Sequence, residues 1–373
     1  MHQPVISGTG VFTPSETITN AELVEAFNAY ADRQNAANAA AIKAGEAEPI
    51  GHSSEEFIVN ASGIHQRHVL DKSGVLDPEV MHPLLRERAD EEPSLMAEMA
   101  LDACNTALDE AGRRGGDVDL VICAASNHER PYPAIAVEIQ KLVGATGFAF
   151  DMNVACSSAT FGIQTASDMI RTGSVRRALV VNPEICSGHL EWRDRDCHFI
   201  FGDVATATLI ERKEDAKGDH FEIVSTRCLT QFSNNIRNNN GFLRRTRPYG
   251  MEDRRDMQFM QNGRKVFKEV LPIVSKHILG HLEDEGISPD DLSRLWLHQA
   301  NKAMNDFIGR KVLGRVPEPE EQPNILQDYA NTSSAGSIIA FSQYSKDLQV
   351  GDTGVICSFG AGYSVGSVIV RRA

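Results

Sequence analysis

The sequence predicts an α/β protein built from two duplicated halves. An apolar stretch at 148–154 runs into Cys156 and then into small residues that suit a helix. The same arrangement recurs 175 residues later, with Asn331 in the place of Cys156. The apolar stretches that match at this offset are 120–123 with 295–298, and a further strand follows each copy at 178–182 and 354–358. Several features sharing one arrangement indicate an internal duplication.

Length and composition are those of a soluble globular protein with a large core. The chain has 373 residues, 42% hydrophobic and 24% charged. Its seven cysteines contain no CxxC pair, so we expect reduced thiols in the cytoplasm and no structural metal. Neither a signal peptide nor an apolar run long enough to span a membrane is expected. The net charge of −14 disfavours binding to nucleic acid or to an anionic membrane.

The first half is expected to begin with a strand at 4–12, closed by a turn at Thr13-Pro14-Ser15. Thr19 or Asn20 then caps a helix. An Ala-, Asn- and Gln-rich region follows from about 25 to 54. The later elements expected here are a helix capped by Ser94 that runs to 108, a strand at 119–124, a proline-bounded loop at 127–133, a helix at 134–143, and strands at 177–181 and 201–210.

The second half is expected to begin near Phe221. A basic, Asn-rich segment from 231 to 255 is interpreted as a long irregular excursion. A helix at about 259–285 then leads to the strand that ends at His298.

Cys156 is the candidate nucleophile, because it lies where a buried strand passes into a helix. Unpaired N–H groups and the helix dipole at such a position lower a thiol pKa from about 8.5 toward neutrality or below. The alternative is a small core residue, since free cysteine is often buried. Two related strand–helix units would bring Cys156, His298 and Asn331 to a shared centre. The alternatives there are a core histidine and a helix-capping asparagine.

Short motifs around these residues carry a family resemblance. They are Ala155-Cys156-Ser157-Ser158-Ala159, His298-Gln299-Ala300-Asn301, Asn331-Thr332-Ser333-Ser334-Ala335 and Ser358-Phe359-Gly360-Ala361-Gly362. In order and spacing the chain resembles the β-ketoacyl-acyl-carrier-protein synthase III family, condensing enzymes of the thiolase superfamily. The resemblance implies a thiolase-like five-layered α/β/α/β/α fold with halves at 1–215 and 216–373, a homodimer, and insertions at about 25–54 and 228–257.

The activity that the resemblance implies is a two-step acyl transfer. Cys156 takes an acyl group from acyl-CoA, and decarboxylative condensation with malonyl-acyl carrier protein gives a 3-oxoacyl product in fatty acid biosynthesis. His298 and Asn331 would hold the enolate, while Cys156, Gly360 and Ala361 would form an oxyanion hole. No cofactor is implied, because coenzyme A enters as part of the substrate. The insertions and the altered coenzyme A segment suggest a donor longer than acetyl.

Further site residues follow only from the resemblance. Phe57, Tyr132, Asn301 and Phe359 are the candidates for substrate binding, with Tyr132 reaching the partner's acyl pocket. Where the family has a tryptophan and an arginine for coenzyme A, this chain has Phe57 and Ala61. Arg264, Lys265 and Lys268, within a basic run that begins at Arg244 and includes Arg247 and Arg254, are the candidates for docking the carrier protein; a solvated charged face is the alternative.

The same residues are compatible with two other functions. A ketosynthase of secondary metabolism with a different acceptor is the nearest alternative. The order Cys, His, Asn also occurs in papain-like cysteine hydrolases, but their Cys-Gly-Ser-Cys-Trp signature is absent. A metal site at Cys186, His189, Cys197 and His198 is disfavoured, because these spacings match no common ligand pattern.

Overall fold

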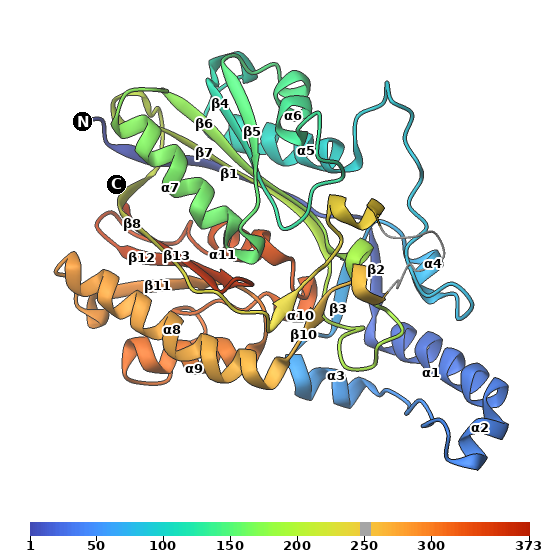
Figure 1. Ribbon diagram of the computed structural model, residues 1–373. Coiled ribbons are helices and arrows are strands. Elements are labelled where there is room, and N and C mark those ends of the chain that lie inside the picture. Colours follow the sequence, from blue (N-terminus) through green and yellow to red (C-terminus); the bar gives the residue numbers. More distant parts are fainter. Residues whose placement is uncertain (247–254) are drawn as a thin grey trace.

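The computed structural model describes residues 1–246 and 255–373, whose main feature is a nine-stranded sheet (Figure 1). The strand order is β11-β12-β13-β8-β1-β7-β6-β4-β5. The first half contributes β1 (Pro4–Phe12), β4 (Leu120–Ala124), β5 (Phe148–Met152), β6 (Arg177–Ile185) and β7 (Asp203–Arg212); the second contributes β8 (Phe221–Thr230), β11 (Leu292–Leu297), β12 (Thr353–Gly360) and β13 (Ser364–Arg372). Strands β1 and β8 join the two sets, pairing antiparallel at Val5 and Ile6.

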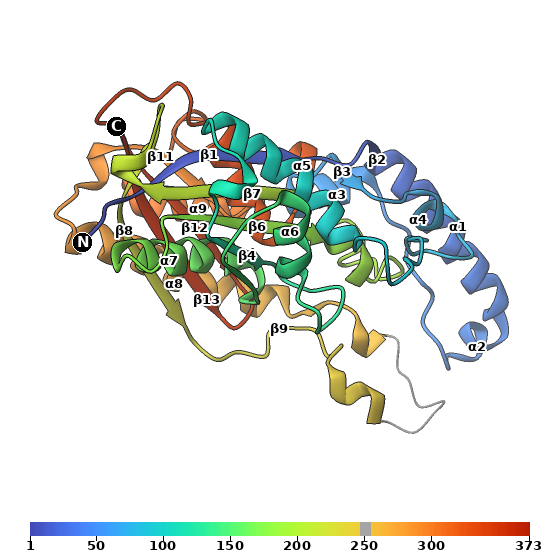
Figure 2. The same ribbon diagram turned by 90° about the horizontal axis from the view of Figure 1, so that it is seen from above.

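Helices and strands stack in five layers, which confirms the predicted thiolase-like fold (Figure 1). The central layer is α7 (Ser158–Arg171) with α11 (Gly336–Gln343), and one apolar core joins both to the inner faces of the two strand sets. The first outer layer is α5 (Leu95–Glu110) with α6 (Ile135–Val143), which lie across the first set in Figure 2. The second is α8 (Gly263–Asp284) with α9 (Lys302–Leu313).

Local sequence explains the close packing of α5 on β1. The Ser94 hydroxyl accepts a hydrogen bond from the Ala97 N–H and so caps the helix, as predicted. Cβ atoms added at Gly8 and Gly10 would lie 2.1 and 1.9 Å from helix carbonyl oxygens. Glycine is therefore required on this strand for the helix to approach.

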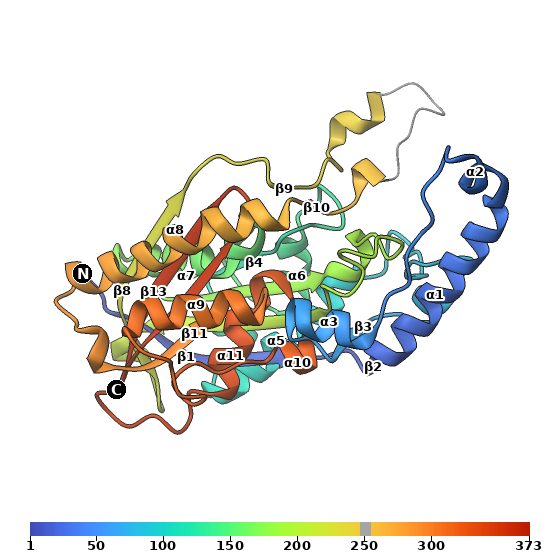
Figure 3. The same ribbon diagram turned by 90° about the horizontal axis from the view of Figure 1, so that it is seen from below.

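A fourth apolar core builds a cap beside the layered body. The cap comprises residues 16–81 and 186–201, together with α10 (Leu326–Tyr329). Its elements are β2 (Glu16–Thr19), α1 (Asn20–Ala37), α2 (Ala39–Ala44), α3 (Glu55–Ser62), β3 (Gln66–Val69) and α4 (Ser73–Leu76). Helices α1 and α2 project away from the sheet in Figure 3.

Asparagine side chains of α1 hold the segment that returns from α2. Asn28 donates to the carbonyl of Ser53 and accepts from its N–H, at 3.2 and 2.8 Å. Asn35 makes the same pair of bonds with Ile50, at 2.9 and 2.8 Å. The side chains of Asn28 and Asn35 therefore supply hydrogen bonds to a returning backbone segment that pairs with no strand. We call these two contacts the asparagine clasp.

The basic segment of the second half differs in part from the prediction. It contains one short strand, β9 (Ile236–Arg237), which pairs antiparallel with β10 (Met260–Gln261) in the range predicted for the next helix. Helix α8 begins at Gly263 and not at 259, because the Asn262 side chain accepts from the Lys265 N–H and caps it. Arg247 and Arg254 of the basic run lie outside the described residues.

The division into halves near residue 215 is retained as a proposal. Strand β7 ends at Arg212 and β8 begins at Phe221, with a short 3₁₀ turn between them.

Among the described residues, every helix is too short or too polar to cross a membrane.

Candidate active site

Cys156 lies in a 3₁₀ turn, Ala155–Ser157, directly before α7. The turn is held locally: the Ala155 N–H donates to Asn153 Oδ1 at 3.0 Å, and the Val154 N–H donates to the Ser158 hydroxyl at 2.8 Å. Ala155 has a φ of 48°, a left-handed conformation that is uncommon for alanine. The chain thus reverses sharply before Cys156 and leaves its side chain partly exposed.

His298 and Asn331 come from matching positions of the second half. His298 follows β11, is 2% exposed, and meets the ring of Phe359 edge-on with centroids 5.2 Å apart. The Asn331 Oδ1 accepts from the Ser333 N–H at 2.8 Å. This bond closes a local turn and is not the predicted helix cap, because the 3₁₀ helix Ser333–Ala335 that follows has Thr332 as its cap residue. It occupies the Oδ1 end of the amide, and the Nδ2 end can donate to a ligand.

One cavity of about 280 Å³ receives all three side chains. Its apolar side chains come mainly from the cap, β9, α8, α9 and β12. The apolar lining residues are Phe199, Ile200, Phe201, Ile236, Phe259, Val266, Phe267, Val270, Met304 and Phe359. A lining that combines three polar or reactive side chains with many apolar ones suits a substrate with one reactive carbonyl and a hydrocarbon chain.

Ser333 and Gly360 complete the surroundings of the thiol. The Ser333 hydroxyl lies 3.5 Å from Cys156 Sγ, and its backbone, like that of Ala330, is left-handed with a φ near 50°. Ser333 is a site residue that was not predicted, although its place in the Asn331-Thr332-Ser333 motif could have indicated it. Gly360 borders the same cavity beside Cys156.

Burial decides the protonation of the two titrating groups. Desolvation raises the pKa of Cys156 to about 11, opposed by the Ser333 hydroxyl and by the N–H groups of Cys156 and Ala361. The expectation that the helix start lowers this pKa is therefore wrong for the unliganded site. Desolvation also lowers the pKa of His298 to about 4, with the backbone of Ser333 opposing it. The resting pair at neutral pH is a thiol and a neutral imidazole.

Candidate substrate residues lie in different surroundings. Asn301 lines the cavity, but its Oδ1 caps α9 through the N–H groups of Ala303 and Met304, and its Nδ2 donates to the carbonyl of Ala61. The Arg195 guanidinium covers one face of the Phe57 ring, 4.0 Å from its centroid. That face is therefore not open to a nucleotide base in this conformation.

The basic candidates Arg264, Lys265 and Lys268 are exposed on the first turns of α8. Val266 and Val270 of the same helix are buried and line the cavity. One helix thus presents an apolar side to the cavity and a basic side to solvent. Tyr132 is 80% exposed and lies outside the cavity lining.

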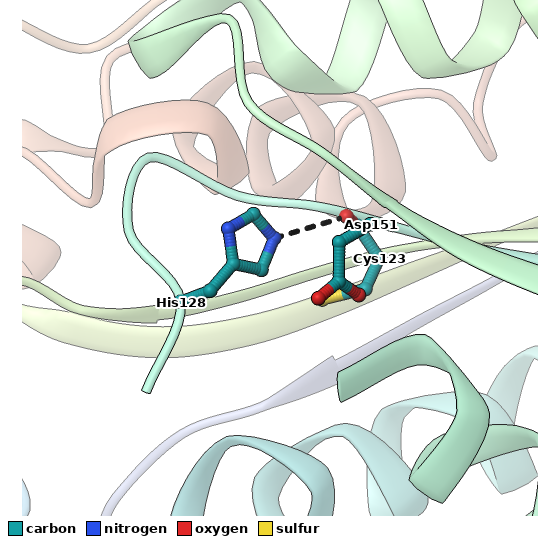
Figure 4. Close-up of side chains that lie close together, drawn as sticks. All are labelled: Cys123, His128 and Asp151. Atoms are coloured by element: carbon teal, nitrogen blue, oxygen red, sulfur yellow. Dashed lines mark hydrogen bonds between the residues drawn. The ribbon is translucent and has the colours of Figure 1, made fainter. Parts of the chain in front are cut away.

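A separate group of potential metal ligands includes Cys123 of β4. Within the described part of the chain, only Cys123, His128 and Asp151 place three ligand atoms within 4.8 Å (Figure 4). Asp151 accepts N–H groups at the start of α6, at 2.8 and 2.9 Å, and the His128 ring lies 3.3 Å from the Cys123 carbonyl. These bonds already explain their positions. The four residues at 186–198 weighed as a metal site form no such group.

Known proteins resemble the chain over its whole length. The family described as 3-oxoacyl-[acyl-carrier-protein (ACP)] synthase III matches residues 150–230, and its C-terminal counterpart matches 282–372. A β-ketodecanoyl-[acyl-carrier-protein] synthase of Pseudomonas aeruginosa is 55% identical over 94% of this chain and 100% of its own. A β-ketoacyl-[acyl-carrier-protein] synthase III of Acidiphilium cryptum is 31% identical over 100% of both chains. The crystal structure of 3-oxoacyl-[acyl-carrier-protein] synthase III from Aquifex aeolicus, 26% identical, has a TM-score of 0.76 and covers 99% of both chains.

Proposed function

The chain belongs to the 3-oxoacyl-[acyl-carrier-protein] synthase III family of condensing acyltransferases, and from this we propose that Cys156 carries an acyl group from acyl-CoA to malonyl-acyl carrier protein. The product is a 3-oxoacyl-acyl carrier protein. The observation that carries the residue assignment is the single apolar cavity that holds Cys156, His298 and Asn331.

The first step exchanges one thioester for another. The Cys156 sulfur attacks the acyl carbonyl, its bond to carbon forms, and the bond to the coenzyme A sulfur breaks. Because the resting thiol is protonated, its proton has to leave during the attack. The neutral imidazole of His298 can accept this proton and return it to the departing coenzyme A thiolate.

The second step makes the carbon–carbon bond. Malonyl thioester loses carbon dioxide, and His298 and the Asn331 Nδ2 group donate hydrogen bonds to the enolate oxygen. The enolate carbon attacks the acyl-Cys156 carbonyl, whose oxygen is held by the N–H groups of Cys156 and Ala361. The carbon–sulfur bond then breaks, and the thiolate takes up a proton. Neutral donors suit this sequence, because each charge that they face is negative and transient.

An eight-carbon acyl donor fits the available observations. The Pseudomonas aeruginosa relative is named for a 3-oxodecanoyl product, whose ten carbons are two from malonyl and eight from a donor. The cavity here is lined by aromatic and aliphatic side chains. The earlier hypothesis of a donor longer than acetyl is thereby narrowed to a medium-length chain.

A homodimer is proposed from the free edge of the sheet. Strand β5 ends the strand order and offers its outer edge for pairing. Exposed apolar side chains lie on and beside it: Phe148 at 46%, Val137 at 44% and Tyr132 at 80% exposure. Burial of this patch against a second copy would bring Tyr132 toward the partner, in keeping with its proposed role at the partner's acyl pocket.

The carrier protein is proposed to dock on the basic side of α8. Arg264, Lys265 and Lys268 are exposed beside the residues of α8 that line the cavity. A basic helix face in a chain of net charge −14 is a local exception that suits an acidic partner. We also propose a cytoplasmic location, because all seven cysteines are free thiols.

Intact-mass measurement after incubation with acyl-CoAs of two to twelve carbons tests the assignment. We expect an octanoyl adduct on the native protein and none on Cys156→Ala. Condensation with malonyl-acyl carrier protein should then remove the adduct. Labelling that persists in Cys156→Ala would contradict the nucleophile, and a preference for acetyl would contradict the chain length.

A further inference from the structure

Glu184, near the end of β6, is a buried carboxylate that binds both halves of the site. It is 1% exposed. The N–H and hydroxyl of Ser126 donate to it at 3.0 and 2.5 Å, and the N–H of Ser334 donates at 3.2 Å. The Ser334 hydroxyl and the Cys186 thiol complete the set. Five donors around one carboxylate fit its ionised, acceptor-only form.

Ser126 is linked by hydrogen bonds to Ala155, the residue before the nucleophile. The Ser126 carbonyl accepts from Asn153 Nδ2 at 2.8 Å, and Asn153 Oδ1 accepts from the Ala155 N–H at 3.0 Å. Ala155 is the left-handed residue that directs Cys156 into the cavity. Glu184 therefore supports the strained turn of the first half.

Ser334 belongs to the turn of the second half that carries Asn331. Ser334 follows Ser333, whose hydroxyl lies 3.5 Å from Cys156 Sγ and whose N–H donates to Asn331. The second-half turn, with Ala330 and Ser333 left-handed, is thus fixed against the same carboxylate. Such turns persist only where surrounding bonds over-determine them.

We propose that Glu184 is a positioning residue of the condensing site, which joins the Cys156 turn to the Asn331 turn through Ser126 and Ser334. The proposal rests on the proposed function for the reaction that it serves. Glu184 does not line the cavity and touches no reacting atom.

The charge of Glu184 gives a readout that a purely structural role would not change. Desolvation raises the pKa of Glu184 itself to about 7, opposed by its serine bonds. Three thiols face it: Cys123, Cys156 and Cys186, and for each of them burial and the Glu184 charge both raise the pKa. Asp203, which binds Ser187 next to Cys186, is the other buried acid nearby.

Two variants separate the effect of the Glu184 charge from the effect of its side-chain length. Glu184→Gln keeps the side-chain length and removes the charge, whereas Glu184→Asp keeps the charge and shortens the reach by one methylene. The pH midpoint of Cys156 alkylation by iodoacetamide, followed by mass at that peptide, reports the charge. Turnover with octanoyl-CoA and malonyl-acyl carrier protein reports the positioning.

We expect Glu184→Gln to lower the alkylation midpoint by about half a pH unit or more. Glu184→Asp should leave the midpoint in place and lower kcat about tenfold or more, with little change in KM. A midpoint unmoved in Glu184→Gln, or kcat within about twofold of native in Glu184→Asp, would overturn the proposal.

Thermal melting identifies variants that fail to fold, and Ser334→Ala, which removes one donor, then takes their place with the same expected loss of kcat. The alkylation assay needs no acyl donor. A native protein that accepts no acyl group would therefore refute the proposed function, while the alkylation result would still decide the link between Glu184 and Cys156.

Discussion

Gly360 lies against Cys156 so closely that a Cβ atom on it would be 2.6 Å from the cysteine Cβ and 3.0 Å from Sγ. The substitution Gly360→Ala must therefore displace the nucleophile. We expect acylation by octanoyl-CoA to fall by at least about tenfold while the fold is kept. Gly351→Ala, where the added atom meets nothing within 4 Å but a φ of 97° strains it, is the control for backbone effects alone. Equal acylation in the native protein and Gly360→Ala would show that the close contact is not needed.

His298 is expected to work as a neutral group. Because its pKa is about 4, the His298 imidazole becomes protonated only well below physiological pH. Malonyl decarboxylation should therefore vary little with His298 protonation between about pH 6 and 8. His298→Ala should lower the decarboxylation rate by about a hundredfold or more, since an enolate donor is lost. Release of carbon dioxide from malonyl-acyl carrier protein measures both, and a rate that rises as an imidazolium forms near pH 6.5 would contradict this assignment.

Glu211 is expected to be important for stability. It is fully buried on β7, and the guanidinium groups of Arg113 and Arg177 each lie 2.8 Å from its Oε2. Glu211→Ala leaves both cations without their buried partner, so the free energy of unfolding should fall by about 3 kcal/mol or more. Glu79→Ala removes an exposed partner of Arg33 and should cost less than about 1 kcal/mol. Urea titrations of the two variants compare them directly, and similar losses would refute the distinction.

Two buried histidines are expected to make the protein sensitive to acid. His277 and His281 share Ser367 between α8 and β13, and desolvation lowers the pKa of each to about 4. The unfolded chain takes up protons near pH 6.5 and the folded protein does not. The free energy of unfolding should therefore be highest above about pH 6.5. It should fall by about 2 kcal/mol per histidine as the pH decreases toward 4.

The variant His281→Gln checks this, with His65→Gln at an exposed position as its control. Denaturant unfolding across pH 4 to 8 should give a shallower acid slope for His281→Gln only. Identical slopes in all three proteins would place the acid sensitivity elsewhere.

The asparagine clasp of α1 is expected to affect the donor site. The returning segment carries the His52 carbonyl, which accepts from Arg195 Nε at 2.7 Å and so holds the guanidinium over Phe57. Because this contact covers the Phe57 ring, replacing Asn28 and Asn35 together by alanine should open the ring to the nucleotide, lower KM for acyl-CoA several-fold and leave kcat nearly unchanged. Asn38→Ala, whose side chain bonds only within its own helix turn, is the matched control. An unchanged KM for acyl-CoA would show that the asparagine clasp contributes to the cap and does not affect the donor site.

The fold was predictable because its signals are local. Buried strands such as 119–124 and capped helices such as the one after Ser94 occur where the sequence predicts them. The duplication extends to the backbone, since Ala155 and Ala330, each directly before a proposed catalytic residue, are both left-handed. Alanine carries no sequence signal for that conformation, so this symmetry became visible only in the structure.

Other features depend on neighbours that are distant in sequence. Glu184 and Ser334 are 150 positions apart, and no spacing rule connects a strand carboxylate with a later serine. The pKa of Cys156 was predicted with the wrong sign because helix position is readable from sequence whereas the depth of burial is not. The predicted start of α8 is wrong because the apolar residue Met260 belongs to the short strand β10, and the helix begins only at Gly263.

The cap imposes an order on synthesis. Its apolar core takes Phe27 and Ile58 from the first part of the chain, Phe199 and Phe201 from the middle, and Leu326 from near the end. As the chain leaves the ribosome, the first of these side chains can pack only against one another until more than half of the protein has been made. The cap therefore cannot be completed until the segment that contains Leu326 has left the ribosome, and its early helices are segments on which a chaperone can act in the meantime.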